Sequence, residues 1–327
     1  MGLSRNAPTV LIVTPYLAGA NNGNWRTAAR WARLLSPTYR TIVQAPDDAT
    51  VAKADVLIAL HARRSRSAVQ RRNAEQPACP LIVVLTGTDL YRDVPEGDAA
   101  ALASLADADR LIVLQDQAVS ALPLQYRAKT DVVYQSARTL RHPAESSHGG
   151  LRCAFVAHLR PEKDPATVIA AWALLPGELP ITLSMIGDAL DASLADAARV
   201  ASAADRRIRC WGPRPHAWTR QAIKRADVLV CASRMEGGAN VIVEAVTAGT
   251  PVVASRMSGN LGMLGDDYAG YFTPGDAGEL AALLRRCHDD AAFMMLLQEQ
   301  CAARAPLFSP EAERAALLGS VERARTT

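Results

Sequence analysis

Residues 226–262, ADVLVCASRMEGGANVIVEAVTAGTPVVASRMSGNLG, decide the fold of this chain. Their first apolar run, residues 228–232, is rich in β-branched side chains and predicts a buried parallel strand. A glycine-containing turn follows, and then a helical run that stops at Gly249-Thr250-Pro251 before a second strand begins at Val252. Strand, turn, helix and strand predict a βαβ unit. Its glycine turn lies at the carboxyl end of the first strand, where open α/β sheets bind their ligands.

The turn carries the chemistry expected of a phosphate and sugar site. Its glycines let backbone N–H groups approach a phosphate closely, and the following helix N-terminus adds partial positive charge. Glu236 in the turn and Glu244 on the helix frame this unit and point to a similar face. Two fixed acceptors suit a ligand with two sets of hydroxyls, such as a nucleotide-sugar. The alternative is two solvated surface glutamates, which the glycine turn and the flanking strands make the weaker interpretation.

Composition sets the broad class. The chain has 327 residues, of which 49% are hydrophobic and 21% charged, as in a globular protein large enough for two domains. Its net charge of +3 is too small to indicate nucleic acid, but is compatible with an anionic small substrate. The six cysteines form no CxxC pair, so we expect reduced core residues in a cytoplasmic protein and no zinc site. We expect neither a signal peptide nor a membrane span.

The first half begins with a buried strand at residues 9–14 and a Gly/Asn loop at 15–24. An amphipathic helix is predicted at 25–35, with Asn24 as its N-cap and Arg26 and Thr27 in its first turn. This helix N-terminus is a second place where an anion could bind, and Arg26 supplies a full charge. The loop could also simply turn the chain. GxGxxG is missing from the whole sequence, so no dinucleotide fingerprint is present.

Further strands are expected at residues 41–45, 56–60, 81–85, 111–114 and 132–134. The arginine-rich run 61–72 is interpreted as a solvated helix face. Strand 81–85 delivers Thr86-Gly87-Thr88-Asp89 to its carboxyl end. The polar stretch 145–150 is the best linker, and beyond it the pattern restarts with strands at 153–157, 181–186 and 208–211. The sequence therefore predicts two doubly wound α/β halves, followed by a helical tail at about 291–325 that could cross back to the first half.

Four motifs of the second half resemble those of retaining, GT-B-fold glycosyltransferases of the family 4 type. They are AHLRPEKD (157–164), SMIGD (184–188), EGGANVIVE (236–244) and PVVAS (251–255). The resemblance implies two Rossmann-like domains facing across a cleft. Lys163 and a nearby basic residue would hold the donor diphosphate, with Glu236 on the sugar and Glu244 on the ribose. The usual arginine of the first motif falls on His158, so either His158 or Arg160 would be the second basic residue.

Three other stretches point to a subgroup. ANNGNWRTAARWA (20–32), LTGTDLYRD (85–93) and SGNLGMLGDDYAGYF (258–272) are similar to the selenosugar synthases of bacterial selenoneine biosynthesis. This resemblance covers nearly the full length. It implies a reaction in which selenophosphate and UDP-N-acetylglucosamine give a 1-selenosugar, UDP and phosphate. A selenophosphate is already an anionic nucleophile, which suits the non-titrating Thr86 at a position where related transferases often carry a histidine.

The resemblance also divides the chain and its site. It implies an acceptor domain at residues 1–144, a donor domain at 151–302 and a helical tail at 303–327, with no metal and no cofactor besides the two substrates. Catalytic roles fall on Lys163, Glu236 and Arg26. The residues implied in donor binding are His158, Arg160, Lys163, Glu236, Gly237, Gly238, Ala239, Asn240, Glu244, Asn260, Leu261 and Gly262. Those implied in acceptor binding are Asn21, Asn22, Asn24, Arg26, Thr27, Thr86 and Asp89.

Two other functions share much of this pattern. A conventional family 4 transferase would use the same donor half to move a sugar onto an alcohol, glycan or lipid. A lipid acceptor favours a basic, aromatic-bearing helix, and helix 25–35 has both features, although its place directly after a strand favours burial. A catalytically inactive fold that only senses nucleotide-sugars is the third interpretation, against which the intact Lys163, Glu236 and Glu244 speak. The sequence leaves the oligomeric state open.

Overall fold

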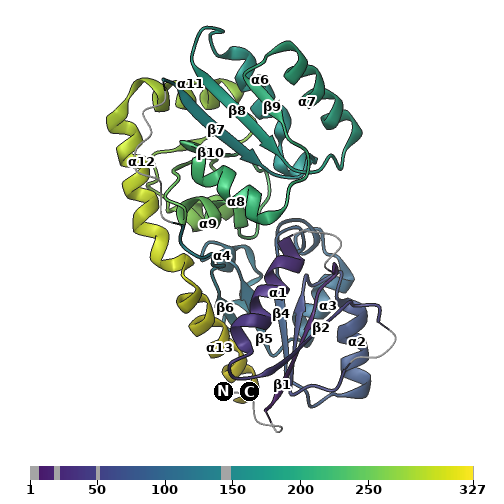
Figure 1. Cartoon of the computed structure of the whole chain (residues 1–327). Coiled ribbons are helices and arrows are strands. Elements are labelled where there is room, and N and C mark those ends of the chain that lie inside the picture. Colours follow the sequence, from purple (N-terminus) through teal and green to yellow (C-terminus); the bar gives the residue numbers. More distant parts are fainter. Residues whose placement is uncertain (1–6, 18–22, 49–51, 141–148, 327) are drawn as a thin grey trace. The chain divides into compact units, whose positions relative to one another are not determined.

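The computed structural model describes residues 7–17, 23–48, 52–140 and 149–326. The chain forms two compact units, one made of Met1–Gln135 with Pro310–Thr327 and the other of Ser136–Ser309 (Figure 1). Most of the predicted linker 145–150, together with Asn21 and Asn22, lies outside the described residues. Each unit is a parallel sheet with helices on both faces, which confirms the two predicted doubly wound α/β halves.

The first unit has a six-stranded sheet in the order β2-β1-β3-β4-β5-β6, with all neighbouring strands parallel. Its elements are β1 (Thr9–Val13), α1 (Gly23–Leu35), β2 (Arg40–Gln44), β3 (Val56–Leu60), α2 (Arg66–Glu75), β4 (Leu81–Leu85), a π-helical turn (Asp89–Asp93), α3 (Ala99–Asp107), β5 (Arg110–Val113), α4 (Ala118–Ala121), α5 (Leu124–Arg127), β6 (Thr130–Val132) and α13 (Pro310–Thr326).

Alternate residues of the same strands build two separate cores in this unit. Leu11, Leu57 and their equivalents face α2 and α3, whereas Val10, Ile58 and their equivalents face α1 and α13. Successive side chains of a strand point to opposite faces, so a strand buried on both sides must be continuously apolar. The apolar runs of β3 and β4, VLIAL and LIVVL, have this composition, and all their residues are buried.

The second unit has a six-stranded sheet in the order β12-β11-β10-β7-β8-β9, again with parallel neighbours. Its elements are β7 (Leu151–Val156), a 3₁₀ turn (Pro161–Lys163), α6 (Pro165–Leu174), β8 (Ile181–Ile186), α7 (Ala192–Ala204), β9 (Ile208–Cys210), α8 (His216–Arg225), β10 (Val228–Cys231), α9 (Asn240–Val246), β11 (Val252–Ser255), α10 (Ser258–Leu264), β12 (Tyr271–Phe272), α11 (Ala277–Asp289), α12 (Ala291–Arg304) and a 3₁₀ turn (Ala305–Phe308).

The sheet order of the second unit places β10 and β7 side by side in its centre. Their carboxyl ends therefore meet at one edge of the sheet, and the loops that follow them lie next to each other. These loops contain Glu236 and Lys163, respectively. The fold thus brings together two motifs that are about seventy residues apart in the chain.

Three sequence expectations need correction. Asn24 does not cap α1, because the helix already begins at Gly23. The arginine run is not uniformly solvated: Arg72 is buried on α2, where its Nε donates to the Cys79 carbonyl at 2.6 Å. Five cysteines are buried core residues as predicted, but Cys210 is exposed because it ends β9, the edge strand.

Candidate active site

Two loops are joined at the carboxyl ends of β7 and β10. The Arg234 N–H donates to the Glu162 carbonyl at 2.9 Å, and Arg234 Nε donates to Asp164 Oδ2 at 2.8 Å. Asp164 is a non-glycine residue with φ of 48°, a conformation that is populated mainly where the surrounding structure imposes it. Its carboxylate also accepts from the Thr167 backbone N–H and hydroxyl and so caps α6. The first loop is thereby held rigidly against the second.

Lys163 and Glu236 meet at this junction. The Lys163 ammonium is hydrogen-bonded to Glu236 Oε1, and the Ser233 hydroxyl donates to the same oxygen at 2.7 Å. Both charged side chains are largely buried, with 18% of Lys163 and 10% of Glu236 exposed. A partly buried ammonium held beside a carboxylate can exchange that partner for the phosphate of a ligand with little loss of charge pairing.

Glu244 belongs to a different cluster on α9. Its Oε1 lies 2.6 Å from Nε2 of His216, the first residue of α8. Its backbone carbonyl accepts from Arg220 Nη1 at 3.1 Å. Burial lowers the pKa of Arg220, which also donates to the Arg138 carbonyl. No local pattern marked His216 or Arg220 as a site residue, because a lone histidine or arginine in a helix gives no signal by itself.

His158 and Arg160 differ in what they contact. His158 Nδ1 accepts from the Asp188 N–H at 3.1 Å and so joins the loops after β7 and β8. Between these loops Gly187 has φ of 153°, and a Cβ at this position would lie 1.9 Å from the Ala157 carbonyl oxygen, so only glycine fits. Arg160 is 43% exposed, and its nearest carboxylate, Glu162, is 3.9 Å away. Arg160 is therefore the more available cation of the two.

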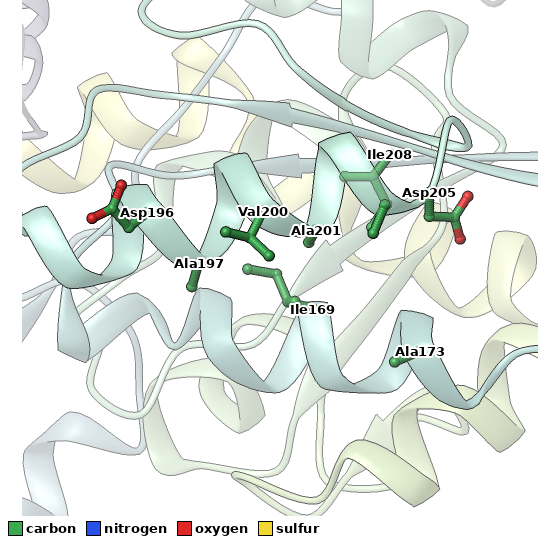
Figure 2. Close-up of a pocket in the computed structure, with 9 residues that line it drawn as sticks. Ile169, Ala173, Asp196, Ala197, Val200, Ala201, Asp205 and Ile208 are labelled. Atoms are coloured by element: carbon green, nitrogen blue, oxygen red, sulfur yellow. The ribbon is translucent and has the colours of Figure 1, made fainter.

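A pocket of 450 Å³ opens beside these loops. Its lining includes Leu159, Gly187 and Asp188 from the first two strand ends and Cys210 and Gly212 from the end of β9. Residues of α7 form its other wall, and the strand ends place it at the edge where open parallel sheets bind ligands. A second pocket, of 490 Å³, is an apolar groove between α6 and α7 lined by Ile169, Val200 and other aliphatic side chains (Figure 2). Neither pocket is lined by a predicted site residue, and the first is the one that lies at the ends of the strands.

The remaining donor residues are placed as follows. Ala239 precedes α9 and Asn240 begins it, while Gly237 is buried and Gly238 half-buried in the turn before them. Asn260, Leu261 and Gly262 lie in α10. The Asn260 side chain is fully buried and donates to Ser255, and the Gly262 carbonyl accepts from Arg304 Nη2 at 2.7 Å. The Asn260 side chain therefore faces the interior, which leaves its backbone for the predicted contact with the donor.

In the first unit, the predicted acceptor residues of α1 are only partly exposed. Thr27 is buried, and its hydroxyl donates to the Gly23 carbonyl at 2.9 Å and accepts from Gln135 Nε2 at 2.6 Å. Both partners of this hydroxyl are protein groups, which favours packing over substrate contact. Asn24 and Arg26 lie half-buried in the first turn of the helix.

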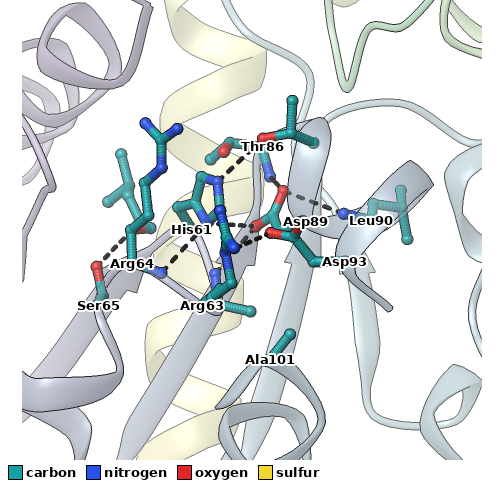
Figure 3. A network of polar contacts seen from close by, with 12 residues as sticks. His61, Arg63, Arg64, Ser65, Thr86, Asp89, Leu90, Asp93 and Ala101 are labelled. Carbon is teal, nitrogen blue, oxygen red and sulfur yellow. Dashed lines mark hydrogen bonds and ion pairs between the residues drawn. The ribbon is translucent and has the colours of Figure 1, made fainter. Parts of the chain in front are cut away.

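The carboxyl edge of β3 and β4 holds a polar cluster around Asp89 (Figure 3). Asp89 was predicted to contact the acceptor, but its carboxylate is fully buried and accepts the N–H groups of Thr86, Gly87, Leu90 and Ala62. It therefore organises the loop that carries Thr86. His61 lies beside it with 2% of its surface exposed, and its Nε2 is 3.0 Å from the Thr88 hydroxyl. In the sequence His61 stands at the start of the arginine run, where nothing marks it as part of a buried cluster.

The burial of His61 predicts that the stability of the protein depends on pH. Burial lowers the pKa of His61, and the positive charges of Arg64 and Arg63 lower it further. The nearby Asp89 and Asp93 carboxylates raise this pKa, but they do not outweigh the effect of burial. The folded protein thus binds this proton less tightly than the unfolded chain, whose histidine has a pKa of about 6.5. We expect the free energy of unfolding to fall as the pH drops below about 6.5, by at most about 1.4 kcal/mol per pH unit from this group.

Urea unfolding between about pH 7 and about pH 5 measures this dependence. His61→Asn is a suitable variant, since φ at this position is 71° and asparagine tolerates such a conformation. The variant should have a flatter pH profile than the native protein. An unchanged slope would show that other groups cause the acid destabilisation.

Among the described residues, no group of three or more His, Cys, Asp or Glu side chains is arranged to hold a metal ion. Within the same residues, no helix is both long and apolar enough to cross a bilayer.

Residues 150–290 match the protein-family profile described as glycosyl transferases group 1. No curated protein sequence matches the chain significantly. Among similar solved structures is HepE from Anabaena in complex with UDP and glucose, which is 16% identical with a TM-score of 0.74 over 96% of this chain and 99% of HepE. Sucrose-phosphate synthase from Thermosynechococcus elongatus is 17% identical with a TM-score of 0.76, covering 97% and 98%. A glycosyltransferase from Rickettsia africae is 12% identical with a TM-score of 0.74, covering 98% and 100%.

At these identities the solved structures establish the fold, and the family profile covers the unit that contains Lys163, Glu236 and Glu244. The chain therefore has the GT-B fold, and its residues 150–290 are similar to the profile of the glycosyl transferases group 1.

Proposed function

We propose that this protein transfers a glycosyl group from a UDP-sugar, and that its acceptor is selenophosphate. The observation that carries the first part is the Lys163–Glu236 pair, held where the loops after β7 and β10 meet. It combines a cation for a diphosphate with a carboxylate for sugar hydroxyls at the functional edge of the sheet. HepE, which has a similar fold, was solved with UDP and glucose, and this supports the same class of donor.

Each donor group has a matching element in the second unit. The base would occupy the 450 Å³ pocket at the ends of β7, β8 and β9. Lys163 and the exposed Arg160 would neutralise the charge that develops on the departing diphosphate. Glu236 would accept hydrogen bonds from the sugar, and Glu244 would leave His216 to accept them from the ribose.

The acceptor proposal rests on the resemblance of the first unit to selenosugar synthases and on the chemistry of selenophosphate. Its selenium is already anionic and attacks C1 of N-acetylglucosamine, while the bond from C1 to the diphosphate oxygen breaks and UDP departs with the electron pair. Water then cleaves the selenium–phosphorus bond to give the 1-selenosugar and phosphate. Such an acceptor needs a cation more than a base, which suits Arg26 and the non-titrating Thr86.

The test is to incubate the purified protein with UDP-N-acetylglucosamine, with and without freshly prepared selenophosphate. UDP release and selenium-containing products are followed by mass spectrometry. Selenophosphate-dependent UDP release with a selenosugar product would support the whole proposal. UDP release with alcohol acceptors but no selenium incorporation would favour a conventional transferase. If UDP and UDP-sugars do not bind at all, the donor proposal is wrong.

Replacing Glu244 by alanine should weaken UDP binding by roughly 10- to 100-fold, because a charged acceptor for ribose hydroxyls contributes about 1.5–3 kcal/mol. Isothermal titration calorimetry with UDP measures this, since UDP carries the ribose but no sugar. Glu299→Ala is a matched control, because Glu299 is exposed on α12 in the same unit. Unchanged UDP affinity in Glu244→Ala would exclude the ribose role.

A further inference from the structure

A set of three buried polar side chains lies beneath Glu236. Ser233 follows β10, Ser255 ends β11 and Asn260 lies in α10, and each is at most 3% exposed. Burying a hydroxyl or amide group costs free energy unless the group is hydrogen-bonded, so we expect these three side chains to be hydrogen-bonded to protein groups.

These side chains form a directed series of hydrogen bonds. Asn260 Nδ2 donates to the Ser255 carbonyl at 2.9 Å and to its hydroxyl at 3.0 Å. The Ser255 hydroxyl donates to the Ser233 carbonyl. The Ser233 hydroxyl donates to Glu236 Oε1 at 2.7 Å. A hydroxyl has one proton to donate, so the proton of each serine is committed and the direction of the series is fixed.

Cys231 contacts both ends of the series, because its Sγ lies 3.8 Å from Asn260 Oδ1 and 3.8 Å from the Ser233 hydroxyl oxygen. Burial raises the pKa of this thiol to about 11, with the Glu236 charge adding to the effect, so it remains a neutral weak donor near neutral pH. The orientation of the Asn260 amide follows, with its oxygen toward Cys231 and its nitrogen toward Ser255.

The backbone of Glu236 is held by the same elements. A Cβ on Gly259, which precedes Asn260, would lie 2.1 Å from the Glu236 carbonyl oxygen. Glycine is therefore required for α10 to pack this closely against the turn. The main chain of Glu236 is thus packed against Gly259 of α10, and its carboxylate is held by Ser233 from the loop after β10.

The two carboxylate oxygens of Glu236 differ in the hydrogen bonds that they accept. Oε1 accepts hydrogen bonds from the Ser233 hydroxyl and the Lys163 ammonium, whereas Oε2 accepts no hydrogen bond within the part of the chain that the structure describes. When a diphosphate draws the Lys163 ammonium away, the Ser233 hydroxyl is the remaining contact of Oε1 among these groups. The carboxylate would otherwise be free to rotate about its side-chain torsions.

We propose that Ser233 is a positioning residue that fixes the Glu236 carboxylate with Oε2 directed at a hydroxyl of the glycosyl donor, and that Ser255 and Asn260 fix Ser233 in turn. The proposal rests on the UDP-sugar donor of the proposed function, but not on the identity of the acceptor. Ser233 acts through Glu236 and contacts no substrate.

The test is a double-mutant cycle of Ser233→Ala and Glu236→Ala, read as affinity for UDP-N-acetylglucosamine and for UDP by calorimetry. Ser233→Ala should weaken UDP-N-acetylglucosamine binding about 10-fold and leave UDP binding unchanged, because only the former has the sugar that Glu236 meets. In the Glu236→Ala background, Ser233→Ala should have no further effect. Ser233→Thr, which keeps the hydroxyl, should restore binding.

Equal losses for UDP and UDP-N-acetylglucosamine, or an undiminished loss in the Glu236→Ala background, would overturn the proposal. The thermal unfolding midpoints of the same four proteins, measured without substrate, test the Ser233–Glu236 contact even if the proposed function is wrong. If the native protein binds no UDP-sugar, the function is wrong. A midpoint loss from Ser233→Ala that disappears in the Glu236→Ala background would then still support the Ser233–Glu236 contact, and a loss that persists would contradict it.

Discussion

Replacing Lys163 by alanine should lower the rate of UDP release from UDP-N-acetylglucosamine by about 10²–10³-fold, the usual cost of removing a donor aimed at developing charge. The Lys163 ammonium is the basic group held against Glu236 at the ends of β7 and β10, and 82% of its side chain is shielded from solvent, since 18% is exposed. Charge on the departing diphosphate grows as the bond to C1 breaks, so an ammonium here stabilises the transition state more than the ground state.

Steady-state kinetics separate this effect from simple binding. We expect kcat to fall more than KM rises, because the lysine acts on charge that appears only during the reaction. Lys163→Arg, which keeps the charge but changes its geometry, should retain part of the activity. Arg225→Ala, at an exposed position of the same unit, is the control and should behave like the native protein. If Lys163→Ala turns over at the native rate, the diphosphate binds elsewhere.

Much of the fold follows from local sequence patterns. Strands β3 and β4 have the predicted bounds because each is a continuous apolar run closed by polar residues or proline, which is what burial on both faces requires. Strand β8 also has the predicted bounds, although it contains the exposed Thr182 and the partly buried Ser184. The motif at 236–244 likewise predicts a glycine turn and helix directly after a strand. The motifs of Lys163 and Glu236 each follow a strand in the sequence. Their contact depends in addition on the sheet order, which places those two strands side by side.

Other parts of the site depend on contacts that no local pattern encodes. Asn260 was expected to contact the donor through its backbone, and no local pattern indicated where its side chain lies. The amide is turned inward because Ser255 and Cys231 offer it partners there. His61 follows an apolar strand and precedes several arginines, so its burial is visible only when β4 supplies the loop that covers it. Contacts between distant segments decide both cases.

The helical tail is the clearest example, because its sequence suggested no chemistry. Glu313 of α13 is buried in the first unit against α1. Arg30 Nε lies 2.9 and 2.8 Å from the two carboxylate oxygens, and the Trp31 indole N–H donates to Oε1 at 2.7 Å. A single glutamate in an amphipathic helix looks like a surface residue, and only the partners on α1, roughly 280 residues earlier in the chain, reveal its role.

Glu313→Ala should therefore destabilise the first unit by about 3–5 kcal/mol, the cost of removing one partner of a buried ion pair. The loss arises because Arg30 keeps a largely buried charge and Trp31 a buried donor, neither of which finds a new acceptor. Urea unfolding measures it, and Glu311→Ala, an exposed position two residues earlier, should stay within about 0.5 kcal/mol of the native protein. The UDP affinity of the folded variant should be unchanged, because the donor residues belong to the second unit. A small stability loss would mean that water reaches Arg30 and Trp31, and that packing of Leu317 and Val321 holds α13 in place by itself.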